Sequence, residues 1–130
     1  MRMDPVVKEL WIEALESGEY KQGYGSLAHT DPDGTMTYCC LGVLCDLAAK
    51  RGIVEAVPGP LDMGFSTYLR YGSSNTLLPP EVSNWAGIAG EDVAVDVHPD
   101  VYGGRAFLGS LNDSRNFDFH QIAQLIREQL

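Results

Sequence analysis

The 130-residue sequence lacks long apolar runs and carries few cations. No apolar stretch approaches the ~20 residues that a membrane-spanning helix needs. Residues 1–10 carry Arg2, Asp4, Lys8 and Glu9 in place of the apolar stretch of a secretory signal. We therefore expect a cytoplasmic protein with no membrane partner.

Basic residues are scarce. Nine Lys and Arg face eighteen Asp and Glu, which gives a formal net charge of −9. Proteins that bind duplex nucleic acid gather basic side chains to displace counterions from phosphates, whereas here no Lys or Arg lies between Arg70 and Arg105. Direct nucleic-acid binding is therefore not expected. The acidity either keeps the protein in solution or docks it on a basic partner surface.

Cysteine is also sparse, and the three thiols are crowded together at Cys39, Cys40 and Cys45. An odd number of cysteines within seven residues is a poor disulfide framework, so reduced thiols are favoured. The spacing is not that of a zinc ribbon. Two weaker metal alternatives combine His29 with the thiols, or use the acidic stretch (Asp92, Asp96, His98 and Asp100). We expect no metal and no cofactor.

The length suits one domain over residues 1–130, and hydrophobic periodicity predicts its elements. In order they are a helix from Asp4 to Gly18, a hairpin over 19–38, a helix over 39–51, a strand over 53–57, a long loop over 58–76, a short helix over 78–87, a strand over 92–97 and a last helix from Asp118. This order predicts an α+β fold. In it, a buried central helix is packed by the amino- and carboxyl-terminal helices against a small, mostly antiparallel sheet.

The central helix is apolar nearly all round, which is typical of a helix buried on several sides. Asp46 is its exception, because a carboxylate in such a helix must reach water or find a partner. Arg105 or Arg115 is the partner that we expect.

Four groups of residues carry a resemblance to a known family. They are Trp11–Leu15 with Ser17–Gly23, Tyr38–Leu47, Leu78–Val82 with Trp85–Gly87, and Leu111–Ser114 followed by Phe119, Ile122, Ala123 and Ile126. The chain resembles a family of small, uncharacterised proteins common in bacteriophage and prophage genomes. The resemblance implies a phage or prophage origin and no known chemistry. It does not extend to residues 58–76 or to the acidic strand predicted over 91–102.

The thiols are also candidates for nucleophilic catalysis. Cys39 and Cys40 begin a helix, where the pKa of a thiol can fall. A hydrolase also needs a base that a third group orients. Of the bases His29, His98 and His120, His98 is favoured because Asp96 shares its face of the predicted strand. The alternative is that the cysteines pack as small hydrophobic residues.

Candidate binding residues lie in two other places. Tyr24, Phe65, Tyr68 and Tyr71 fall in glycine-rich segments, where aromatic side chains either anchor a ligand or fold back on the core. Asn112 and Asp113 precede the last helix and form either a capping turn or a polar cluster facing a pocket.

Three functions are consistent with these features. The leading hypothesis is a non-enzymatic, acidic phage-type protein that binds a host or defence protein with a basic surface, in the cytoplasm of the bacterial host. The second is a protein that sequesters a small nucleotide-like signal under the aromatic loop, which for a polyphosphate would require Arg70, Arg105 and Arg115 to converge. The third is a cysteine hydrolase. The oligomeric state stays open.

Overall fold

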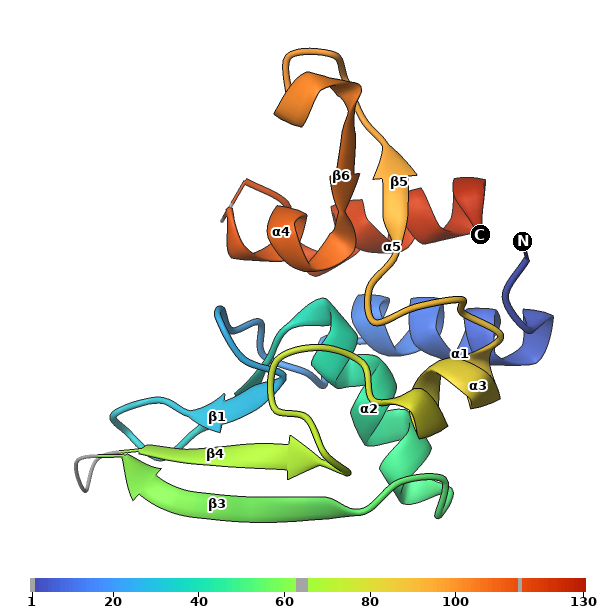
Figure 1. Ribbon diagram of the computed structural model, residues 1–130. Coiled ribbons are helices and arrows are strands. Elements are labelled where there is room, and N and C mark those ends of the chain that lie inside the picture. Colours follow the sequence, from blue (N-terminus) through green and yellow to red (C-terminus); the bar gives the residue numbers. More distant parts are fainter. Residues whose placement is uncertain (1, 63–65, 115) are drawn as a thin grey trace.

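The computed structural model describes residues 2–62, 66–114 and 116–130, which form one α+β domain (Figure 1). In chain order the elements are α1 (Pro5–Glu16), β1 (Ala28–Thr30), β2 (Met36–Tyr38), α2 (Cys40–Lys50), β3 (Ala56–Asp62), β4 (Ser66–Tyr71), α3 (Pro80–Ala86), β5 (Ala94–Asp96), the 3₁₀ turn η1 (Tyr102–Gly104), β6 (Arg105–Phe107), α4 (Leu108–Asp113) and α5 (Phe119–Gln129). The predicted fold class is confirmed.

The larger sheet is antiparallel, with the strand order β2-β1-β4-β3. The long loop predicted over 58–76 is wrong, because β3 and β4 pair there as a hairpin. The sequence of β3 does not resemble a strand, because it contains Pro58, Gly59 and Pro60. An edge strand tolerates proline because its outward side needs no ladder hydrogen bonds, and the register of β3 shifts between Pro58 and Leu61.

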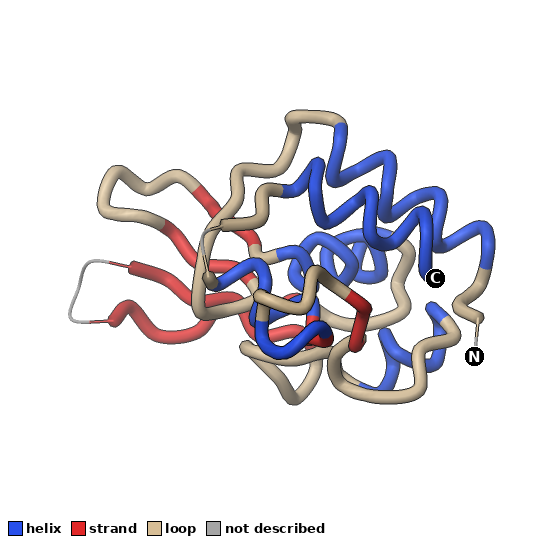
Figure 2. The backbone as a smooth tube through the Cα atoms, turned by 90° about the horizontal axis from the view of Figure 1, so that it is seen from above, coloured by secondary structure: helices blue, strands red, loops and turns tan. Residues whose placement is uncertain are grey.

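Helix α2 lies at the centre of the core, between the sheet and the other helices (Figure 1). Helices α1 and α5 lie side by side (Figure 2). The indole Nε1 of Trp11 in α1 donates a hydrogen bond to the Cys40 carbonyl at 2.9 Å. Gly42 lets α2 approach the chain entering β1, because a Cβ there would overlap the Leu27 carbonyl oxygen.

Local signals place the ends of the outer helices. Asp4 caps α1 by accepting from the Val6 and Val7 amides, and Pro5 occupies the first helical position. Asp118 and Gln121 form the predicted capping box at the start of α5.

The predicted strand near residue 95 belongs to a second, two-stranded sheet. Strands β5 and β6 pair antiparallel, and the ribbon projects beyond α4 and α5 (Figure 1). Its base joins the core through Val95 and Ala106, which are buried. Asn112 and Asp113 do not lie in a turn as the capping-turn alternative has it; they are the last residues of α4.

Candidate functional site

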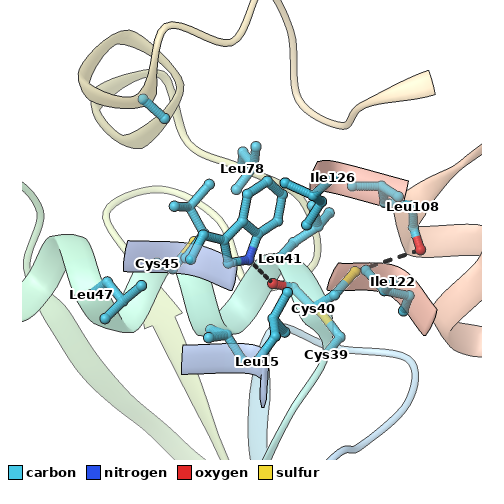
Figure 3. Packing of buried hydrophobic residues seen from close by; sticks show 14 of the residues in the cluster. Leu15, Cys39, Cys40, Leu41, Cys45, Leu47, Leu78, Leu108, Ile122 and Ile126 are labelled. Carbon is cyan, nitrogen blue, oxygen red and sulfur yellow. Dashed lines mark hydrogen bonds between the residues drawn. The ribbon is translucent and has the colours of Figure 1, made fainter. Parts of the chain in front are cut away.

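The predicted thiol nucleophiles lie in the hydrophobic core (Figure 3). Cys39 is 4% exposed, and Cys40 and Cys45 are completely buried. The Cys39 sulfur accepts from the Gly42 amide at 3.4 Å, and the Cys40 sulfur donates to the Leu108 carbonyl at 3.5 Å. Burial raises the pKa of the Cys39 thiol to about 12 from its ordinary value of 9. Loss of solvation therefore raises the pKa of Cys39 by more than the positive end of the helix, which the sequence suggested as an activator, lowers it.

The catalytic pair predicted for those thiols does not form. Asp96 bonds to Arg105 at 2.6 Å, whereas His98 contacts Asp100. The two side chains do not share a strand face because β5 ends at Asp96. Among the described residues, no hydrogen bond joins an imidazole to a thiol.

The two other candidate bases are placed differently. His29 bonds through Nδ1 to Ser26 at 2.7 Å and stacks on Tyr68. His120 lies exposed on α5. Neither imidazole is hydrogen-bonded to a cysteine.

A small cavity of about 190 Å³ lies beside Cys39 and is also lined by Asp92 and Asp113. Both carboxylates accept hydrogen bonds from backbone amides. Asp92 accepts from Val93 and Gly109, and Asp113 accepts from Gly25. Burial raises the pKa of Asp92. In the part of the chain that the structure describes, no three His, Cys, Asp or Glu side chains are grouped to hold a metal ion.

The half-buried carboxylate of Asp46 in α2 has different partners from the predicted ones. Asp46 accepts from the Tyr20 hydroxyl at 2.6 Å and pairs with Lys50 at 3.1 Å. Burial, followed by the hydrogen bond to Asp46, raises the pKa of Tyr20 to about 12. Of the two predicted partners, Arg105 is bonded to Asp96 and Arg115 lies outside the described residues.

The predicted aromatic loop is divided between the core and the surface. Tyr71 is completely buried, which raises the pKa of its hydroxyl. Tyr68 and Tyr24 are half-buried, and Phe65 lies outside the described residues. Arg70 lies on β4, in a different sheet from Arg105.

Asn112 joins three parts of the fold. Its side chain is completely buried, and its amide nitrogen donates to the Gly23 carbonyl at 2.9 Å and to Asp113 at 3.2 Å. Its oxygen accepts from the Gln22 amide at 2.9 Å and from the Cys40 backbone at 3.2 Å. The hydrogen-bonding groups of this side chain are thus used inside the protein.

Among the residues whose exposure the structure describes, the most exposed large apolar side chains outside α1 belong to the ribbon of β5, η1 and β6, residues 94–107, which we call the arm. Tyr102 is 60% exposed and Phe107 is 53% exposed. Tyr102 adopts a φ of +47°, the only positive value at a described residue other than glycine. Aromatic side chains in such surroundings are typical of interaction surfaces.

The two edges of the arm differ. The side-chain amide of Gln129 caps the outer edge of β5, since it donates to the Asp96 carbonyl and accepts from the Asp96 amide, both at 2.8 Å. Among the described residues, no strand pairs with the outer edge of β6. The sequence interpretation missed Tyr102 and Phe107; the aromatic residue directly before Gly103 and Gly104 was the available signal.

Comparison with known proteins places the chain in a family. Residues 3–130 match the family model described as "Domain of unknown function (DUF8296)". The chain belongs to this family. No curated protein and no solved structure matches it. None of the described helices is long and apolar enough to span a bilayer. The family description names no activity.

Proposed function

We propose that this protein is a non-enzymatic binding protein that docks its arm on a basic surface of a partner protein. The resemblance to small phage and prophage proteins supports a partner among host or defence proteins of the bacterial cytoplasm. The main support for the proposal is that Tyr102 is exposed and has a positive φ. A bulky residue in the left-handed region at an exposed tip costs folding free energy, on the order of 1 kcal/mol. The strained backbone keeps the Tyr102 side chain exposed to water, where this side chain contributes little to the stability of the fold.

The chemistry of the arm fits a protein partner. Tyr102 and Phe107 present apolar surface that a partner would bury, and aromatic anchors of this kind dominate binding energies. The unpaired edge of β6 offers backbone groups that a partner can meet with hydrogen bonds.

Charge selects the kind of partner. Asp96 is neutralised by Arg105, but the exposed carboxylates of Asp100 and of Glu91, which precedes β5 in the chain, have no Lys or Arg partner among the described residues. With a formal net charge of −9 for the whole chain, the electrostatic field favours a basic surface and speeds association with it.

The buried thiols support a non-enzymatic role. The Cys39 thiol combines 4% exposure with a raised pKa, and its hydrogen-bond partner is a backbone amide. A nucleophile needs the opposite: access, a lowered pKa and a neighbouring base.

A comparative capture experiment tests the proposal. Immobilised wild-type protein, a Tyr102→Ser/Phe107→Ser variant and a Val6→Ser control are exposed to lysate of the bacterial host, and bound proteins are quantified by mass spectrometry. Val6 is a matched control because it is 68% exposed and lies on α1. Because both anchors are removed, we expect a partner held by wild type and control to fall at least about tenfold with the arm variant. Capture of that partner should also weaken as salt is raised.

Two results would overturn the proposal. One is equal capture of every enriched protein by the arm variant and the control. The other is the lack of any protein enriched by the wild type over empty beads.

A further inference from the structure

A second surface lies where the first turn of α1 meets the end of α3, and its chemistry differs from that of the arm. Gly87 ends α3 with a φ of +74°, and the Asp4 amide donates to the Ala86 carbonyl at 2.8 Å. Beside this junction is a cleft of about 720 Å³, lined by residues 2–4 and by residues of α1, α3 and α5. The cavities beside Cys39 and Tyr20 are about 190 and 230 Å³. Pockets that hold small molecules measure roughly 300–1,000 Å³, so this cleft has the size of a ligand site.

The charges of the cleft reverse those of the whole chain. Acidic side chains outnumber basic ones two to one in the sequence, yet three basic and two acidic side chains line the cleft. The cations are Arg2, Lys8 and Arg127, and the carboxylates are Asp4 and Glu128.

Three of these five charged groups are already engaged. Asp4 accepts the amides of the first turn of α1, and Glu128 accepts from Gln124 at 2.8 Å. Arg127 bonds to Glu16 at 2.7 Å. By contrast, the charged ends of Arg2 and Lys8 have no hydrogen bond or ion pair with any described residue, although Lys8 is half-buried.

The cleft also contains a free aromatic donor. Trp85 of α3 is half-buried and lines the cleft, and no described residue accepts a hydrogen bond from its indole nitrogen. Tryptophan stacks well on flat heteroaromatic rings, while Lys and Arg bind phosphate. Two unengaged cations match the charge of one phosphate monoester, which is between about −1.5 and −2 at neutral pH.

We infer that this cleft, which we call the Trp85 cleft, binds a nucleoside monophosphate, with the base against Trp85 and the phosphate held by Arg2 and Lys8. The inference does not depend on the arm. It also differs from the nucleotide site expected from the sequence, which placed the ligand under the aromatic residues of 58–76.

Calorimetry with three probes tests both halves of the site. Adenosine 5′-monophosphate carries ring and phosphate, adenosine carries only the ring, and ribose 5-phosphate carries only the phosphate. We expect saturable binding of the first, and at least about tenfold weaker binding of the other two, because each lacks one anchor. The other three common ribonucleoside monophosphates are titrated in parallel to find the preferred base.

Matched variants assign the site. Arg2→Gln/Lys8→Gln removes the two unengaged cations, and Lys21→Gln/Arg70→Gln removes two cations from other parts of the surface, so both proteins change charge equally. We expect the first to lose at least about tenfold in affinity and the second to bind like wild type. Circular dichroism confirms that each variant is folded.

Tryptophan fluorescence reports on the ring contact. Trp11 is completely buried, so quenching by the nucleotide should come from Trp85 and disappear in Trp85→Phe. The inference is overturned by any of four results: no nucleoside monophosphate binds at concentrations up to about 1 mM, both double variants bind equally well, ribose 5-phosphate binds as tightly as the nucleotide, or quenching persists in Trp85→Phe.

Discussion

The rate at which the native thiols are alkylated distinguishes a buried α2 from a helix that carries a catalytic cysteine. Iodoacetamide reacts with the thiolate, so the rate depends on the ionised fraction as well as on access. The pKa of Cys39 is raised from 9 to about 12. At neutral pH this difference lowers the thiolate fraction about a thousandfold relative to an ordinary cysteine. Burial of the sulfur slows the reaction further, because local opening must precede attack.

Intact-mass spectrometry at pH 7.5 measures this directly. A Ser73→Cys variant supplies the matched control, because residue 73 is exposed and its new thiol reports the rate of an accessible cysteine in the same protein. We expect one adduct on this variant in the time that leaves the native protein unmodified, and three adducts on the native chain in guanidinium chloride. If Cys39 or Cys40 were alkylated as fast as the new thiol, the assignment of α2 to the core would be refuted.

The remaining predictions concern stability. Replacing Asn112 with Leu should cost about 3 kcal/mol in urea unfolding, because the Gly23 carbonyl and the Cys40 amide lose their buried partner; a cost below about 1 kcal/mol would contradict the role given to this side chain. Gly42→Ala should lower the melting temperature strongly, because its Cβ overlaps the Leu27 carbonyl, whereas Gly90→Ala, with no atom nearer than 4.0 Å, should change it little. Stability should fall as the pH rises above about 9: unfolded Cys39 then releases a proton that the folded state keeps up to about 12, which costs about 1.4 kcal/mol per pH unit. Burial also raises the pKa of the Cys40 and Cys45 thiols, so urea titrations from pH 8 to 10.5 should show a slope steeper than that of Cys39 alone, and Cys39→Ala should reduce it.

The sequence predicts those parts of the fold that local chemistry determines. Asp4 and Pro5 start α1, and Asp118 with Gln121 starts α5, because a helix terminus is completed by side chains within a few residues of it. The burial of α2 could be predicted because apolar residues cover nearly its whole surface.

Other features depend on contacts between distant parts of the chain. The run Pro58-Gly59-Pro60 disfavours a strand locally, and only its place at the edge of a sheet makes β3 possible. From the sequence Trp85 is expected to be a core residue of a short helix, and its exposure to a cleft results from the junction between the end of α3 and Asp4, the N-cap of α1.

The candidate site was predicted less well than the fold. The sequence suggests a reactive role for the thiols and a binding role for Asn112. In the structure the thiols are buried, and Asn112 makes its hydrogen bonds inside the protein. The partner of Asp46 was within reach of sequence reasoning, because Lys50 follows it by one helical turn. For Tyr102 the following Gly103-Gly104 pair was the available signal, whereas the exposure of Phe107 could not be foreseen, since it depends on how far the ribbon projects from α4 and α5.

Photo-cross-linking in the proposed bacterial host tests the binding role of the arm most directly. A photoreactive phenylalanine analogue is placed at position 102, or at position 6 as the control, and covalent adducts are identified by mass spectrometry after irradiation. The binding role of the arm predicts a discrete adduct with a protein that has a basic surface from position 102 and none from position 6. Irradiation that yields no adduct at position 102, or the same adducts at both positions, would contradict it.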